Sequence, residues 1–377
     1  MIFEPEYRDR APRNRGISGL APRLHVDPPL FVALLALTGL GLAILFSASG
    51  ESTTLMSKQG VRLGIAFAVM FVMAQIPGQT LYRWSAPVFL IGTSLLVLVL
   101  LLGVTGKGAQ RWLDLGFIRF QPSEIMKLAV PIAVARFIHD HGMPPRYRHV
   151  LAVLAILGIP AALIAQQPDL GTALLVATAG LSVLFIAGLS WLTIALLGGA
   201  ATAALPLLWL TMHDYQRQRV LTLLDPEKDP LGSGYHIIQS KIALGSGGLF
   251  GKGWLNGSQA HLQFLPERST DFIFAVYGEE FGFLGLIMLL IIYLVIILRG
   301  MQIAASAQST FERLLAAGLS LTFFVYVFVN TGMVTGILPV VGVPLPLVSY
   351  GGTSMVTLMA SFGILMSIQT HRKLLAQ

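Results

Sequence analysis

A cluster of cations and polar side chains between residues 107 and 127 has the composition of a site for an anionic ligand. Its members are Lys107, Arg111, Trp112, Arg119, Gln121, Glu124 and Lys127. Glu124 and Lys127 are three residues apart, so on a helix they share one face. Lys and Arg side chains can form charge-assisted hydrogen bonds to an anionic group. A helix start capped by Ser123 is the alternative interpretation, but it leaves Lys127 and the arginines without a role.

Asp271 is a candidate site residue at the mouth of the eighth predicted span, close to Arg268. It follows a long polar segment and precedes a long apolar run. A helix cap is the alternative role for Asp271, and Ser269 and Thr270 are competing candidates for that cap.

Other polar residues near these candidates have two interpretations each. Asp169 follows Pro168, so it either caps the next helix or positions Lys127 as a carboxylate partner. Arg217 and Lys241 belong to the polar segment 211–271 and add cations that could contact an anionic substrate. Residues 245–253 are rich in glycine but lack the spacing of a phosphate-binding loop, and His213, His236 and His261 match no metal-ligand spacing.

The elements that must position these residues are transmembrane helices. Charged residues make up 11% of the chain and apolar residues 55%, whereas a soluble domain carries about 25% charged residues. Runs with few or no charges predict an all-α polytopic membrane protein with about ten spans. The runs are 28–50, 63–81, 85–106, 124–138, 150–168, 170–212 (two spans, broken near Gly188), 272–298 and 314–370 (two spans, broken by Pro339, Gly342, Pro344 and Pro346).

The distribution of Lys and Arg predicts the orientation. The arginines of the N-terminal tail, residues 1–27, and of the C-terminal tail, residues 371–377, place both termini in the cytoplasm. One membrane domain then covers residues 28–370, and the large loop 211–271 faces outward. The short connection after the third span also faces outward, yet it holds Lys107, Arg111 and Arg119 against the positive-inside rule. An anionic ligand on the outer surface is the simplest explanation.

Composition also excludes several classes of function. The chain has no cysteine, which excludes disulfides and thiolate catalysis. The net charge of +7 fits anionic lipid and gives no argument for nucleic acid. The long Arg-rich N-terminus predicts that the first span is an uncleaved anchor.

Seven segments resemble the SEDS family (shape, elongation, division and sporulation), and within it the rod-shape members of Gram-negative bacteria. They are 107–116, 119–127, 167–172, 213–219, 225–253, 264–275 and 336–352. The resemblance implies a peptidoglycan glycosyltransferase that polymerises lipid II on the outer face of the inner membrane. It implies that Asp271 is the essential aspartate of the outer loop. As a general base for the hydroxyl of an acceptor sugar, such a carboxylate typically contributes roughly 10²–10⁴-fold to the rate. It also implies that an outer cavity contains Arg111, Trp112, Arg119, Gln121, Glu124, Lys127 and Asp169.

The resemblance further implies a class B penicillin-binding transpeptidase and other membrane proteins of the elongation complex as partners. Whether a divalent cation, Mg²⁺ or Mn²⁺, assists the reaction is open at this point. Two other functions are alternatives. A lipid II flippase predicts polar residues through the full membrane depth, and a noncatalytic scaffold leaves Asp271 and the outer cations without a role.

Overall fold

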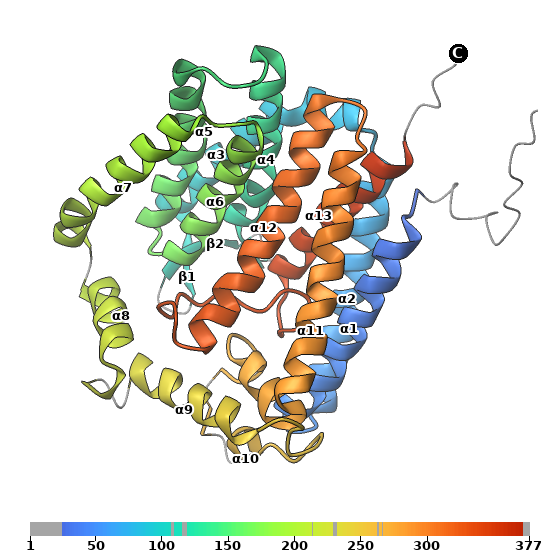
Figure 1. The fold of residues 1–377 in the computed structure, drawn as a ribbon, viewed down its shortest axis with the longest axis vertical. Helices are drawn as coiled ribbons and strands as arrows, with labels where there is room; N and C mark the ends of the chain where they lie inside the picture. The colour runs from blue at the N-terminus through green and yellow to red at the C-terminus, as the bar shows by residue number, and fades with distance from the viewer. Residues whose placement is uncertain are drawn as a thin grey trace, which may run out of the picture.

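The computed structural model describes residues 25–106, 109–114, 119–212, 214–228, 232–261, 264–265 and 267–371. Helices occur at the position of every predicted span (Figure 1). They are α1 (Pro28–Ala48), α2 (Thr53–Ala74), α3 (Gly78–Leu102), α4 (Pro122–His141), α5 (Tyr147–Gln166), α6 (Leu170–Ile186), α7 (Trp191–Thr211), α11 (Ile273–Ala305), α12 (Thr310–Val334) and α13 (Thr353–Thr370).

Within the described residues, seven helices are long and apolar enough to cross a membrane, namely α1, α2, α3, α5, α11, α12 and α13. The prediction of an all-helical polytopic membrane protein is therefore confirmed. The helix α4 differs from these seven because it carries Glu124, Lys127, Arg136 and Asp140, and α6 is 17 residues long. The total of ten spans and their orientation stay predictions.

The predicted bounds of the second and third spans were wrong, because charge-free runs do not mark helix ends in this chain. The second span was predicted over 63–81, but α2 begins at Thr53 and ends at Ala74, and α3 then begins at Gly78. The cation that delayed the predicted start is Arg62, which lies within α2 over the ring of Tyr350, 4.4 Å from its centroid. A cation can be accommodated within a membrane helix where it faces a partner in the protein.

The connection between α3 and α4 is a small antiparallel sheet, which the all-α prediction missed. Its strands are β1 (Val104–Gly106), β2 (Ala109–Asp114) and β3 (Arg119–Phe120), and β2 lies in the middle. Leu113 pairs with Phe120 and Asp114 with Arg119. The sheet satisfies backbone groups of an otherwise irregular connection and leads the chain from Arg111 back to the start of α4.

The polar segment 211–271 forms short helices rather than a structureless loop. They are α8 (Asp214–Leu224), the 3₁₀ helix η1 (Pro226–Lys228), α9 (Ser233–Ser246) and α10 (Ser258–His261). In Figure 1, α7, α8 and α9 form an arc that leaves the bundle at α7 and returns to it where α9 meets α11.

The helix α11 is broken at Gly282, whose φ of 65° is a conformation that favours glycine. Gly251 of the segment 211–271 approaches the backbone of this break closely, and Gly253 N donates to Glu280 O (2.9 Å). Residues 273–280 before the break are buried on all sides. The break therefore turns the first part of α11 into the protein, and Asp271 enters the interior with it.

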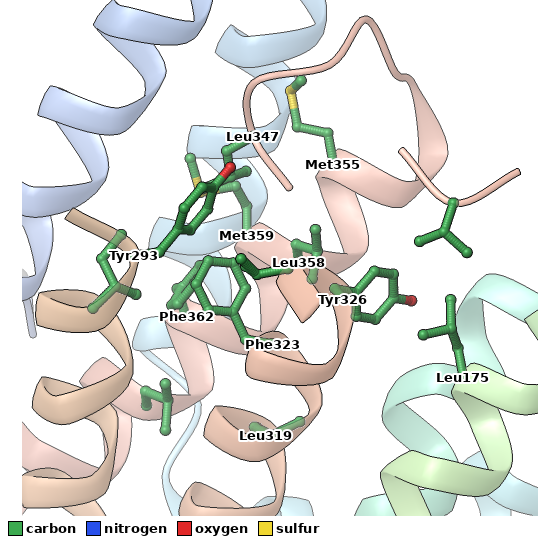
Figure 2. Close-up of a cluster of buried hydrophobic side chains, with 14 of the residues drawn as sticks. Leu175, Tyr293, Leu319, Phe323, Tyr326, Leu347, Met355, Leu358, Met359 and Phe362 are labelled. Atoms are coloured by element: carbon green, nitrogen blue, oxygen red, sulfur yellow. The ribbon is translucent and has the colours of Figure 1, made fainter. Parts of the chain in front are cut away.

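A cluster of aromatic and aliphatic side chains, mainly from α11, α12 and α13, forms part of the hydrophobic core (Figure 2). Phe323 and Phe362 meet edge to face with ring centroids 5.0 Å apart. The Tyr293 hydroxyl donates to Pro346 O (2.7 Å) in the irregular segment 335–352 between α12 and α13. This bond fixes the proline-rich segment to the bundle, as expected for irregular backbone at membrane depth.

Candidate active site

A cavity of about 650 Å³ lies where α4, α6 and α13 begin and α12 ends. Charged and polar side chains from distant parts of the chain line it together with the irregular segment before α13. The polar and aromatic members of the lining are Arg111, Trp112, Gln121, Glu124, Lys127, Asp169, Thr172, Arg219, Glu267, Thr270, Asp271, Tyr326, Tyr350, Thr353 and Ser354.

Lys127 and Glu124 form a buried ion pair on one wall of the cavity. Lys127 Nζ donates to Glu124 Oε1 at 2.7 Å, and each side chain is only 7% exposed. The ammonium also lies 5.4 Å from the ring centroid of Tyr326, whose hydroxyl points toward α6 in Figure 2. Glu124 Oε2 has no hydrogen-bond partner within the described protein. The pair therefore places a cation, held by a buried carboxylate, in the wall of the cavity.

The Ser123 side chain, which was considered as the cap of α4, does not cap this helix. The N-cap residue of α4 is Gln121, it makes no side-chain cap bond, and the Ser123 hydroxyl has no partner within the described protein. The interpretation of Ser123 as the cap is wrong. Glu124 lies in the first turn, where the helix dipole favours a negative charge.

Asp169 caps α6, as considered, and it also binds a cation, but that cation is Arg111 and not Lys127. As the N-cap residue of α6, it accepts a hydrogen bond from Thr172 N with Oδ1 (3.2 Å). Its Oδ2 accepts from Arg111 Nη1 (3.2 Å) and Gln121 Nε2 (3.1 Å). Asp169 therefore positions Arg111, not Lys127, at the edge of the cavity.

Asp271 lies just before α11 and is half-buried. The N-cap residue of α11 is Phe272, so the interpretation of Asp271 as the cap residue is wrong. The neighbouring Arg268 does not line the cavity. Its guanidinium group approaches Gly50, and burial lowers its pKa.

Backbone contacts hold Asp271 against the irregular segment 335–352. Ser349 Oγ donates to Thr270 O (2.5 Å), and Tyr350 N donates to Ser269 O (2.8 Å). Gly342 lies beside the carboxylate, and a Cβ atom at that position would be 3.5 Å from Asp271 Oδ2. The irregular segment therefore lies against the backbone next to Asp271 and beside its carboxylate.

The structure brings seven of the ten predicted site residues into one cavity, namely Arg111, Trp112, Gln121, Glu124, Lys127, Asp169 and Asp271. The side chain of Arg119 lies outside the described part of the chain. Arg217 is used elsewhere, because its guanidinium group donates to Trp209 O (2.9 Å) and Leu210 O (2.8 Å) at the end of α7. Lys241 is exposed and lies against Gly336, outside the cavity lining.

Sequence reasoning missed several residues of the cavity, of which Arg219 and Tyr326 are the most informative. Arg219 belongs to the same segment as Arg217, and the two residues point in different directions because they are two apart on a helix. Tyr326 comes from an apolar run in which no sequence signal distinguishes it from a core residue.

The described residues offer no ready-made metal site. They contain no group of three or more His, Asp or Glu side chains close enough to hold one ion. The carboxylates Glu124 and Asp169 are engaged by Lys127 and by Arg111 and Gln121. No step below depends on a divalent ion.

Sequence comparison decides the family. The family model FtsW/RodA/SpoVE, described as "Cell cycle protein", matches residues 28–374. The chain belongs to this family. The peptidoglycan glycosyltransferase MrdB of Escherichia coli K12 is 55% identical over 356 residues, which cover 94% of this chain and 96% of that protein. The MrdB protein of Helicobacter pylori J99 is 38% identical over 93% of this chain and 91% of its own length.

Solved structures of the FtsW/RodA/SpoVE family have the same fold. The rod shape determining protein RodA of Thermus thermophilus superposes with a TM-score of 0.70 at 28% identity, over 92% of this chain and 98% of that one. A chain from a study of the coordination of polymerization and crosslinking by a peptidoglycan synthase complex gives a TM-score of 0.79 at 33% identity. That match covers 91% of this chain and 97% of the other.

Proposed function

We propose that this peptidoglycan glycosyltransferase polymerises lipid II into glycan strands in the cavity described above, with Asp271 as the general base. The observation that carries the assignment is the single chamber that joins Asp271 to Lys127 and Arg111. The relatives named peptidoglycan glycosyltransferase cover almost the whole chain, which supports the same reaction class here.

The proposed reaction uses the residues in complementary ways. The hydroxyl oxygen of an acceptor sugar attacks the anomeric carbon of a lipid-linked donor, and the bond from that carbon to the pyrophosphate breaks. The hydroxyl proton goes to the Asp271 carboxylate. The pyrophosphate leaves with the bonding electron pair, and Lys127 and Arg111 neutralise its growing charge. Asp169 holds the Arg111 guanidinium group in place for this contact.

The geometry favours a polymerase over a flippase. Glu124 and Lys127 lie in the first two turns of α4, and Asp169 caps the start of α6. The opposite end of α4 has a different pair, Arg136 and Asp140, which does not line the cavity. A one-sided site is suited to chemistry at one membrane surface, whereas transport across the bilayer needs a polar path through it.

The proposed location and partners follow the family. The cavity would face the periplasm from the inner membrane, with both chain termini in the cytoplasm, as the distribution of Lys and Arg predicts. A single-span class B penicillin-binding transpeptidase would bind beside the polymerase, together with other membrane proteins of the elongation complex. The similarity to a chain of a peptidoglycan synthase complex supports this partner.

The test is polymer formation by the purified protein on lipid II. Asp271→Asn should lose about 10²–10⁴-fold in rate, because the amide keeps the shape and cannot accept the proton. Asp225→Asn, which removes a surface ion pair to Lys228 outside the cavity, is the matched control and should retain activity. Full activity of Asp271→Asn would reject this base. No polymer from the wild type, even with its transpeptidase present, would favour the flippase.

A further inference from the structure

The outer loop and the adjoining part of α11 expose five large apolar side chains that the proposed reaction does not use. They are Leu249 (62% exposed), Phe250 (80%), Trp254 (46%), Phe283 (55%) and Leu284 (51%). We call these residues the loop patch, and none of them lines the active-site cavity. Clustered exposed apolar side chains indicate a surface that contacts a partner or a membrane.

The loop patch continues the lipid-facing surface of α11. Phe283 N donates to Gly248 O (2.9 Å) and Leu284 N to Leu249 O (3.1 Å), so the loop is fixed to α11 directly after the break at Gly282. Beyond this point α11 exposes further apolar side chains, namely Ile287, Met288, Leu290, Ile291 and Leu294. Residues 283–305 rise about 34 Å at ~1.5 Å per residue, close to the ~30 Å hydrocarbon core. The patch therefore lies at one boundary of the bilayer.

The single charge at the tip of the loop is paired with a carboxylate of the protein. Lys252 is the only charged residue between 245 and 255. Its ammonium group donates to Glu279 Oε1 (2.6 Å) and Ser258 Oγ (2.8 Å). Glu279 is completely buried, so the cation is held by a carboxylate of the protein interior. The energetic cost of a charge in the membrane interior does not oppose insertion of Leu249 and Phe250.

Trp254 connects the loop patch to α1. Its indole N–H donates to Ala43 O (3.1 Å), and its ring lies 6.2 Å from the ring of Phe46. Figure 1 shows α10 beside the lower ends of α1 and α11. Trp side chains are enriched at membrane–water interfaces, because one part of the ring is apolar and the N–H group is polar.

We propose that the loop patch inserts into the interfacial region of the phospholipid bilayer and anchors the end of α9 and α10 to the membrane surface. The occupant is lipid, because the patch continues a lipid-facing helix surface, is rich in aromatic rings, and has its only neighbouring tip charge, Lys252, paired with Glu279. The anchor is independent of the assignment of Asp271, since it depends only on the position of the patch at the end of α11.

The absence of cysteine from the chain allows a direct test with single spin labels. Phe250→Cys and Leu249→Cys carry nitroxides in vesicles of phosphatidylethanolamine and phosphatidylglycerol, and collision with oxygen is compared with collision with a water-soluble nickel chelate. Leu294→Cys on α11 and Glu227→Cys on the exposed part of the polar segment are the lipid and water references. We expect both patch labels to favour oxygen, as at Leu294. Nickel accessibility equal to that at Glu227 would overturn the proposal and leave a protein partner for the patch.

A second measurement guards against disturbance by the label. The double variant Leu249→Ser, Phe250→Ser should raise hydrogen exchange of α9 in vesicles by about tenfold or more, because two apolar side chains lose their contact with lipid. The conservative pair Leu249→Ile, Phe250→Trp should keep exchange at the wild-type rate. Equal exchange in the serine variant and the wild type would contradict the anchor.

Discussion

Asn330 on α12 holds the backbone of Asp271 in place. Its Nδ2 group donates to Asp271 O (2.9 Å) and also to Val343 O (2.7 Å). Asn330 is completely buried, and its Oδ1 atom has no hydrogen-bond partner within the described protein. One amide thus fixes the proposed general base to the irregular segment that lies beside its carboxylate.

The role of Asn330 predicts a loss of rate on substitution. Asn330→Asp removes both donated bonds and places a carboxylate against two carbonyl oxygens, so Asp271 should shift within the cavity. A displacement of about 1 Å can cost ~10²-fold, and we expect this loss in kcat for polymerisation of lipid II. Thr331→Ala, which removes a hydroxyl bonded only within α12, is the control. An unchanged kcat in Asn330→Asp, with the protein folded, would contradict the positioning role.

Variants of the ion pair between Lys127 and Glu124 should have separate effects on thermal stability and on polymerisation activity. Lys127→Met leaves a buried carboxylate without its cation, which typically costs about 3–5 kcal/mol of stability. Adding Glu124→Gln removes that charge and should restore much of the thermal stability in detergent. Activity should stay low in both variants, because neither supplies a cation for the pyrophosphate.

Substitution of Lys127 by arginine tests whether a positive charge alone is sufficient. Lys127→Arg keeps the charge but replaces a compact ammonium group with a planar guanidinium group, so we expect a polymerisation rate below that of the wild type. If the double variant Lys127→Met, Glu124→Gln polymerised lipid II at the wild-type rate, the pair would be only structural.

Asp169 allows its two roles to be tested separately. Asn is nearly as good an N-cap as Asp, so Asp169→Asn should keep the start of α6 and the thermal stability. It removes the negative charge that holds Arg111, and we expect a rise in KM for the lipid-linked donor. Asp169→Ala should lose activity and, in addition, about 1 kcal/mol of stability through the cap. Wild-type kinetics in Asp169→Asn would leave only the capping role.

Gly342 should be sensitive to a single added methyl group. Its φ of 76° disfavours any residue with a Cβ atom, and that atom would face Asp271 Oδ2. Gly342→Ala should therefore lower the polymerisation rate by about tenfold or more, since the segment and the carboxylate must both move. Gly351→Ala is the matched control, because Gly351 also lines the cavity but has a negative φ and more space. Equal effects of the two substitutions would show that the contact with Asp271 is unimportant.

The sequence by itself determined that this is a helical membrane protein and where every long helix lies. It also determined which groups of neighbouring residues line the cavity. Apolar runs of sufficient length have few alternatives to helices in a bilayer, because backbone groups must be bonded within the segment. The pairing of Glu124 with Lys127 was also readable, since a spacing of three residues places both on one helix face. Charge-free runs located helices but not their ends, as α2 shows with Arg62 packed over Tyr350.

Only the tertiary structure decided which residues surround Asp271. Asn330 and Gly342 are 59 and 71 positions away along the chain, and no periodicity within a helix relates such distant residues. The choice between Arg217 and Arg219 depends on how α8 meets α7, because the carbonyls of Trp209 and Leu210 bind one arginine while the other lines the cavity. Local sequence sets the face of a helix on which a side chain lies, but the packing of separate elements sets what that face meets.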